Sequence, residues 1–97
     1  MASSREYLDF VLEQLSALEG VTSRAMMGEY VLYYRGKVVG GVYDDRFLLK
    51  PTKSAKALMP DAQMETPYPG AKPMLVAEID DPALCCRAVE AIAADLS

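Results

Sequence analysis

The sequence predicts an α+β fold of two layers, in which helices cover one face of an antiparallel sheet of four or five strands. Apolar residues recur at helical spacing near both ends of the chain. Between them, runs rich in β-branched and aromatic residues are separated by two-residue turns, as in hairpins. The expected order is α-β-β-β-α-β-α, and the length of 97 residues predicts a single domain over residues 1–97.

The first helix is predicted from its start signal and its apolar stripe. Ser3 is the expected N-cap, with Glu6 as the partner that completes a capping box. Gly20 is expected to end the helix, because glycine readily takes the left-handed conformation that follows a helix. The stripe that should face the sheet consists of Leu8, Val11, Leu12, Leu15 and Leu18.

Three strands are predicted next, joined by tight turns at Arg35-Gly36 and Asp44-Asp45. They span residues 29–34, 37–43 and 46–50, and residues 22–27 can supply a further strand before them. Gly40-Gly41 lies inside the second strand, where glycine marks a bulge or a close approach. We favour a close crossing of the first helix at this point over the approach of a ligand.

A short helix is predicted after the third strand. Pro51 ends that strand because it cannot donate a ladder hydrogen bond. Thr52 or Ser54 is expected to cap the helix, which covers residues 52–59. Residues 61–73 are expected to be irregular.

The last strand is predicted over residues 74–79, and Asp81-Pro82 is a typical start for the final helix. Adjacent cysteines, Cys85 and Cys86, diverge by about 100° on a helix. We therefore expect one core thiol and one peripheral thiol rather than a disulfide or a metal pair. The buried stripe is expected to comprise Cys85, Ala88, Val89, Ile92 and Leu96.

The composition argues against an enzyme and against metal or cofactor sites. The chain contains no histidine, which removes the commonest general base and the commonest neutral metal ligand. The carboxylate pairs Asp44-Asp45 and Asp80-Asp81 have local explanations as a turn and a helix cap. No glycine-rich phosphate-binding motif occurs. We expect a non-enzymatic protein with no cofactor and no metal.

Charge is unevenly distributed along the chain. The formal net charge of −4 counts against broad nucleic-acid binding. Residues 35–56 nevertheless carry six cations against two acids, whereas residues 57–97 carry two cations against seven acids. We expect the basic region to be a solvated sheet edge and helix face, with a docking patch for an acidic partner or a phosphate as the alternative.

Signals for a membrane or for secretion are missing from the sequence. No apolar run has the length of a transmembrane helix, and the N-terminus lacks the basic and apolar regions of a signal peptide. We therefore expect a cytoplasmic protein without membrane contact.

Four tyrosines fall on the predicted strands. By alternation, Tyr30 and Tyr34 share one face of the sheet and Tyr33 takes the other, while Tyr43 lies on the next strand. We expect these rings to pack across strands or to form a homodimer contact. Stacking on single-stranded nucleic acid is the alternative.

The stretch YPGAKP, residues 68–73, forms a proline-rich loop together with Pro67. Prolines fix φ and hold the residues before them extended, and Gly70 permits a turn. One hypothesis is that the loop closes one end of the sheet near Met27-Gly28 and Lys50 and makes a shallow binding surface with Lys72. The alternative is a rigid corner that packs Tyr68 into the core.

Several blocks resemble the N-terminal domain of the TfoX/Sxy competence regulators. They are RAMMGEYVLYYRGKVVGGVYDDRFLLKP at residues 24–51, PYPGAKPM at residues 67–74, and the Asp-Pro helix at the end. The resemblance covers roughly residues 5–95. Its best-matching features are Met27-Gly28, Tyr30, Gly36-Lys37, Asp45, Leu49-Lys50 and Tyr68-Pro69-Gly70.

The resemblance implies a two-layer α+β fold similar to secretion-chaperone-like and YjbR-like domains. It also implies a role in transcription of competence genes together with the cyclic-AMP receptor protein, and it brings no catalytic residues. The full-length regulators carry a second, C-terminal domain, and we expect this chain to be a stand-alone member.

The sequence supports three candidate functions. The first is a regulatory domain, expected to be a homodimer, that binds a protein partner of the transcription machinery. The second is a small-molecule sensor with a pocket at the proline-rich loop, and the third is DNA binding through residues 35–56. The candidate binding residues are Met27, Gly28, Tyr30, Lys50, Tyr68, Pro69, Gly70 and Lys72.

Overall fold

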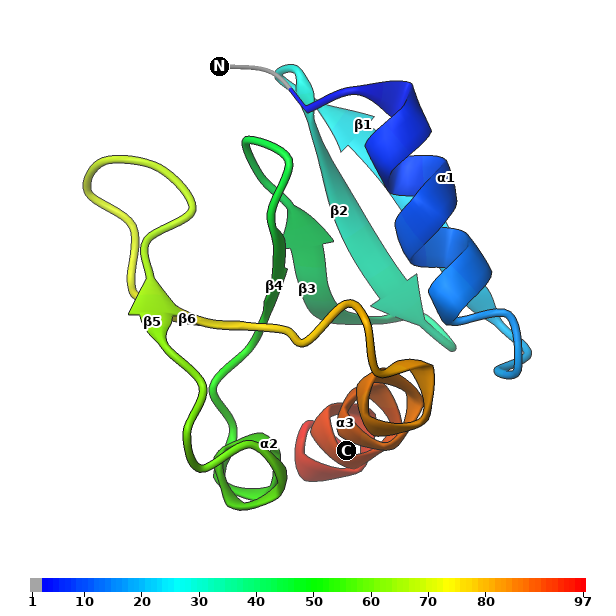
Figure 1. Cartoon of the computed structure of the whole chain (residues 1–97), viewed down its shortest axis with the longest axis vertical. Helices are drawn as coiled ribbons and strands as arrows, with labels where there is room; N and C mark the ends of the chain where they lie inside the picture. Colours follow the sequence, from blue (N-terminus) through cyan, green and yellow to red (C-terminus); the bar gives the residue numbers. More distant parts are fainter. Residues whose placement is uncertain (1–2) are drawn as a thin grey trace.

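A computed structural model describes residues 3–97 and confirms the α+β class (Figure 1). In this part of the chain, six antiparallel strands form one sheet in the order β1-β2-β3-β4-β6-β5. The helices are α1 (Arg5–Gln14), α2 (Lys53–Leu58) and α3 (Pro82–Asp95). The strands are β1 (Val21–Met26), β2 (Glu29–Tyr34), β3 (Lys37–Val42), β4 (Phe47–Leu49), β5 (Met64–Glu65) and β6 (Met74–Val76).

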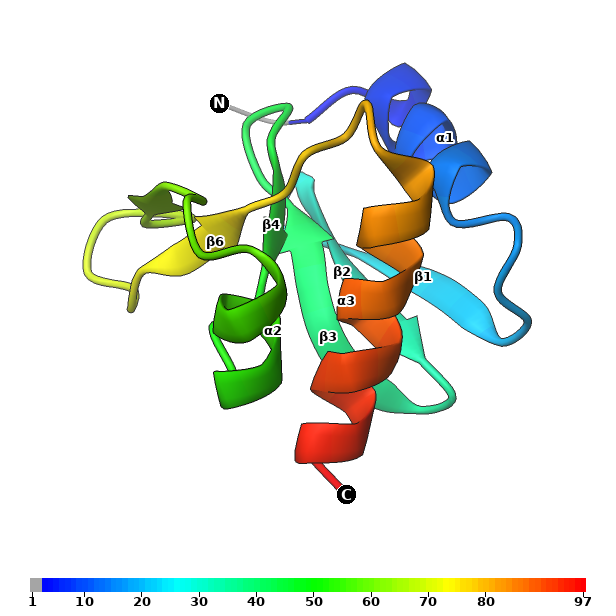
Figure 2. The same cartoon turned by 60° about the horizontal axis from the view of Figure 1, so that its bottom comes forward.

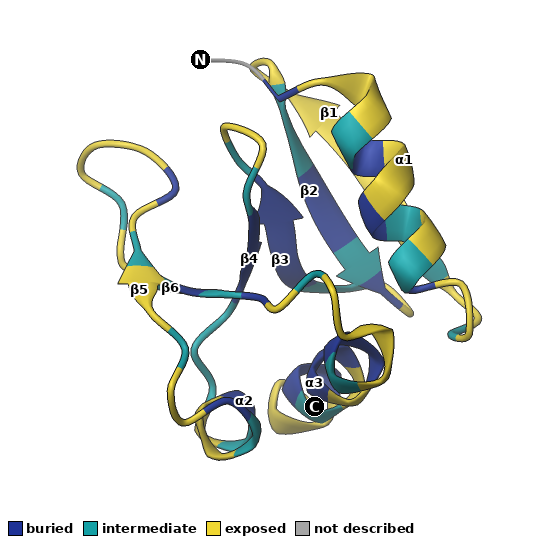
Figure 3. Cartoon of the chain, viewed as in Figure 1, coloured by how far each residue is buried: buried dark blue, intermediate teal, exposed yellow. Residues whose placement is uncertain are grey.

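The core lies between the sheet and the helices, all three of which contribute buried residues to it. Leu32, Gly40, Leu49 and Leu75 pair in turn across β2, β3, β4 and β6, and the three leucines belong to the core. Figure 2 shows α3 crossing in front of the sheet, and Figure 3 shows burial concentrated on β2, β3, β4 and the helix sides that face them. The helix residues in this core include Leu8, Val11, Ala55, Cys85, Ala88, Val89 and Ile92.

Three two-residue turns set the first four strands in register. Met27-Gly28, Arg35-Gly36 and Asp44-Asp45 all have positive φ at both residues, between 51° and 85°. A hairpin turn with two positive φ angles matches the right-handed twist of its strands. The predicted turns at 35–36 and 44–45 are therefore confirmed, and the further strand near residues 22–27 is present as β1.

The start of α1 differs from the prediction by one residue. Ser4 is the N-cap, because its hydroxyl accepts a hydrogen bond from the N–H of Tyr7 at 3.1 Å. Ser3 is instead buried and donates its hydroxyl to Glu29 at 2.6 Å. The predicted capping box between Ser3 and Glu6 is therefore wrong, since Ser3 is committed to the sheet.

The end of α1 is also earlier than predicted, at Gln14 rather than at Gly20. The N–H groups of Ser16 and Leu18 bond to the third residue before them, so tighter turns follow the helix. Gly20 has φ +95° and accepts a hydrogen bond from the N–H of Arg35 at its carbonyl, at 3.0 Å. It leads into β1 instead of capping the helix.

The glycine pair in β3 allows neighbouring atoms of the sheet to approach its backbone closely. A Cβ on Gly40 would lie 2.2 Å from the carbonyl oxygen of Leu48, and one on Gly41 would lie 2.5 Å from the ring of Tyr43. The expected crossing of the first helix at this point is wrong. The close approaches come from β4 and from an aromatic ring.

The C-terminal half follows the prediction with four differences, the first of which is that β6 ends at Val76 and not at residue 79. Thr52 caps α2 and Asp81 caps α3, as predicted. Residues 61–73, expected to be irregular, contain the two-residue strand β5. Leu96 is 41% exposed and lies outside the buried stripe of α3, and both Cys85 and Cys86 are buried.

Candidate functional site

The sheet has a second face, turned away from the helices, that we call the open face. Val31, Gly41, Leu48 and Val76 pair across four strands, alternating with the core row. Val31 and Leu48 are buried there. Their burial on a face without helices means that other segments cover part of it.

Residues 66–73, which we call the proline loop, supply part of that cover. The loop joins β5 to β6, and β4 separates these strands from β3. The ring of Tyr68 nevertheless lies 6.3 Å from the ring of Tyr43, which directly follows β3. The loop therefore bends back over the open face.

The shape of the proline loop follows from its sequence. The N–H of Ala71 donates to the carbonyl of Tyr68 at 3.1 Å, and Gly70 has φ +88°. Proline followed by glycine at the centre of such a turn is typical of type II. Pro67 is buried and Tyr68 is 59% exposed, so the alternative in which Tyr68 packs into the core is wrong.

Arg46 fastens the proline loop to the hairpin between β3 and β4. Its guanidinium forms an ion pair with Glu65 and donates to the carbonyl of Thr66 at 3.3 Å. Its Nε also donates to the carbonyl of Tyr43 at 3.1 Å. One side chain therefore ties together the two segments that carry the facing tyrosines.

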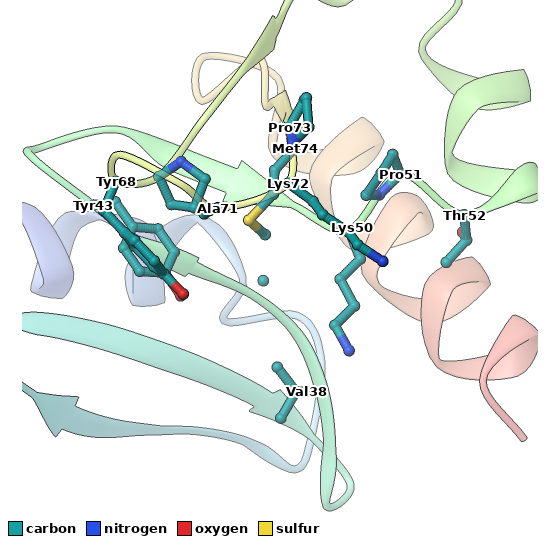
Figure 4. Close-up of a pocket in the computed structure, with 12 residues that line it drawn as sticks. Val38, Tyr43, Lys50, Pro51, Thr52, Tyr68, Ala71, Lys72, Pro73 and Met74 are labelled. Carbon is teal, nitrogen blue, oxygen red and sulfur yellow. The ribbon is translucent and has the colours of Figure 1, made fainter.

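A first hollow of about 410 Å³, the lysine hollow, lies between the proline loop and the end of β4. Figure 4 shows Lys50 and Lys72 on one side of it, with the rings of Tyr43 and Tyr68 on the other. Its remaining lining is mostly apolar, and none of the carboxylate side chains within residues 3–97 lines it. Among residues 3–97, neither lysine forms an ion pair.

A second hollow of about 540 Å³, the methionine hollow, lies on the other side of the two tyrosines. It is lined by Met26, Met27, Glu29, Val31, Tyr43 and Tyr68. Met27 is 98% exposed at the tip of its turn. Because Tyr43 and Tyr68 line both hollows, the two form one continuous surface.

Burial and nearby negative charge affect the ionisation of Tyr43. Burial is the main cause that raises the pKa of its phenol, and the tyrosine Tyr68 and the carboxylate of Glu29 add to it. Tyr43 therefore stays a neutral hydrogen-bond donor between the hollows at physiological pH.

Glu29 fixes the far end of the methionine hollow. One carboxylate oxygen accepts from the hydroxyl and N–H of Ser3, and the other accepts from the N–H of Asp44 at 3.0 Å. Asp45 adds a bond from its own N–H to the Ser3 hydroxyl at 3.0 Å. The carboxylate of Glu29 is thus engaged in holding two turns together.

The family profile described as the TfoX N-terminal domain matches residues 13–93, most of the chain. The chain belongs to the TfoX N-terminal domain family. It is also 41% identical over 78 residues to a protein of Spirochaeta aurantia, described as an uncharacterized 12.7 kDa protein in the trpE 5′ region. That alignment covers 80% of this chain and 68% of the relative.

In this TfoX N-terminal domain the candidate residues fall into separate groups. Lys50, Tyr68 and Lys72 meet at the lysine hollow, and Met27 joins Tyr68 at the methionine hollow. Pro69 lines a smaller neighbouring hollow. Gly28 and Gly70 shape the turns through their positive φ angles.

Tyr30 does not belong to this surface of the TfoX domain. Its ring packs against the helix-side core, as Tyr34 does, while Tyr33 lines a hollow beside β1. The predicted alternation is therefore correct, and it removes Tyr30 from the candidate site. Tyr43, Val31 and Met26 take part instead, and the candidate residues chosen from the sequence missed them.

Within residues 3–97, no group of three or more cysteine, aspartate or glutamate side chains could hold a metal ion. None of the helices described is long and apolar enough to cross a membrane.

Proposed function

We propose that the chain is a non-enzymatic regulatory domain that binds a protein partner on its open face. The observation that carries this proposal is the clustering of exposed apolar side chains. Among residues 3–97, three of the six exposed large hydrophobic residues, Met26, Met27 and Tyr68, line the methionine hollow. Exposed apolar residues gathered at one place are typical of an interaction site.

The side-chain types at this surface favour a protein partner. Methionine adapts to varied surfaces, and tyrosine supplies a large contact area with a polar tip. Both residue types are enriched at protein interfaces. Membership of the TfoX N-terminal domain family supports a partner in competence-type transcription regulation, acting in the cytoplasm.

The distribution of cations favours a protein over DNA as the partner. Arg35 lies 5.3 Å from the ring centre of Tyr34, and Arg46 pairs with Glu65, so both are engaged within the domain. The net charge of −4 further opposes a polyanion. DNA binding through the basic stretch 35–56 is therefore a weaker candidate than protein binding on the open face.

A small-molecule ligand is the second candidate, and the lysine hollow supports it. Its volume of about 410 Å³ lies within the range of small-molecule sites, and its lining combines apolar groups with two cations. A metabolite that binds there would raise the melting temperature of the wild-type protein. Lys72→Ala should remove that rise without lowering the melting temperature of the free protein.

We also propose that the domain forms a homodimer. Strand β1 is an edge strand, hydrogen-bonded on one side to β2, and five of its six residues are exposed. Such an edge can pair with a second copy. Sedimentation at several concentrations would reveal the dimer.

A pull-down from extract of the source cells, with and without nuclease, tests the protein-binding proposal. Three tagged proteins are compared: wild type, Met27→Ser/Tyr68→Ser, and the control Phe10→Ser, which removes an exposed ring on α1. We expect wild type and the control to recover the same partner after nuclease treatment, and the double variant to lose it. A partner that the double variant retains, or that nuclease removes, contradicts the proposal.

A further inference from the structure

We propose that the partner presents an extended acidic segment, with a carboxylate side chain docked between Lys50 and Lys72 and an apolar side chain two positions away in the methionine hollow. The inference rests on the proposed function and specifies the chemistry of the partner at that surface. It starts from the two lysines. They come from different parts of the chain, one following β4 and one in the proline loop, yet they border the same hollow.

Charge around the lysine hollow is unbalanced within the domain. No carboxylate lines the hollow, and within residues 3–97 neither ammonium group has an ion-pair partner. Two like charges that border one hollow repel each other, and an anion placed between them relieves that repulsion.

The nearby cations differ from this pair. Arg46 is neutralised by Glu65, and Arg35 lies over the ring of Tyr34. Lys53 and Lys56 are exposed on α2 and do not line the hollow. Of the cations in this region, only Lys50 and Lys72 both line the lysine hollow and have no ion-pair partner within residues 3–97.

The lining of the two hollows favours a peptide over a free phosphate or a nucleic acid. Pro67, Pro73 and Met74 give the lysine hollow an apolar wall that a phosphate alone would leave uncovered. The methionine hollow continues the surface past Tyr43 and Tyr68. Side chains two positions apart on an extended segment point to the same side and can reach both hollows, and a carboxylate pairs with lysine without the charge density of a polyanion.

The experiment selects peptides from a random twelve-residue phage library on three immobilised proteins. They are wild type, Lys50→Glu/Lys72→Glu, and the control Lys53→Glu/Lys56→Glu, which makes the same charge change on α2. All three should melt at similar temperatures, because the four lysines lie outside the core. A selected peptide is then synthesised with a fluorescent label for titration.

We expect wild type and the control to select peptides with an acidic residue two positions from an apolar one, because these two side chains point to the same side of an extended segment. The labelled peptide should bind Lys50→Glu/Lys72→Glu about tenfold or more weakly than wild type. Peptides without acidic enrichment, or equal binding to both double variants, overturn the inference and leave the proposed function standing. If wild type selects no peptide and binds a labelled single-stranded oligonucleotide through the same lysines, both proposals fail.

Discussion

At the scale of single residues, the open face depends on a glycine and a tyrosine two positions apart. Tyr43 leans back along β3, and its ring occupies the space that a Cβ of Gly41 would need. The sequence predicted a close approach at Gly40-Gly41 but not which residues make it. Alternation assigns each side chain to a face of the sheet, but it does not give the direction in which the side chain tilts along that face. Lys50, Tyr68 and Lys72 could be selected in advance, since the proline loop and the family resemblance both pointed to them.

Replacing Gly41 by alanine should destabilise the domain by about 1–3 kcal/mol. The new Cβ would lie 2.5 Å from the Tyr43 ring and 2.6 Å from the backbone oxygen of Tyr30, and the latter cannot move without disturbing the sheet. Thermal unfolding measures the effect. Gly36→Ala is the control, because its Cβ meets open space and its cost arises from the φ of +83° alone. A Gly41→Ala protein as stable as wild type would refute the packing described for Tyr43.

Cys85 should make the stability of the domain depend on alkaline pH. Burial, with Cys86 and Asp81 as smaller causes, raises the pKa of this thiol from 9.0 to about 11. The unfolded chain therefore loses the proton first as pH rises, so a stabilisation of about 2 kcal/mol that is present below pH 9 disappears by pH 11. Chemical unfolding of wild type and Cys85→Ala between pH 8 and pH 11 isolates the contribution. A difference between the two proteins that stays constant across this range would contradict the prediction.

At the scale of elements, the hairpins were predictable and the connection to β5 was not. The turns at 35–36 and 44–45 separate runs of β-forming residues, so their spacing revealed them. Strand β5 has two residues and no periodicity, and its ion pair to Arg46 joins positions 19 residues apart. Likewise, no local signal in the sequence revealed that the Ser3 hydroxyl donates to Glu29. Ser4 therefore caps α1 in place of Ser3.

Replacing Arg46 by methionine should loosen the proline loop. The change keeps the apolar stem but removes the bonds to Glu65, Thr66 and Tyr43. Since the ion pair is partly exposed, we expect a loss of only about 1 kcal/mol, with faster amide hydrogen exchange in residues 64–71. Arg5→Met is the control, because it breaks an exposed ion pair with Asp9 on α1. Unchanged exchange in the loop would mean that Arg46 does not hold it.

At the scale of the whole molecule, one face of the sheet builds the core and the other carries the candidate site. The α+β class was predictable because periodicity distinguishes helices from strands even when their boundaries move by several residues. A shallow surface between the proline loop, Lys50 and Met27-Gly28 was also predicted. Its division into two hollows by Tyr43 was not, because that depends on the proline loop bending back across β4 to reach Tyr43. The contact between Tyr43 and Tyr68 joins residues far apart in the sequence, and it forms only once the strands have assembled into the sheet.

Photo-crosslinking in the source cells is the most direct test of the claim that the open face is the binding surface. A benzophenone amino acid is placed at Tyr68 in one protein and at Phe10 in another, since both positions are exposed and aromatic but only Tyr68 lies on the open face. We predict a discrete crosslinked protein from position 68 and none from position 10. Crosslinks from position 10 alone would place the partner on the helix side and contradict the assignment of the open face.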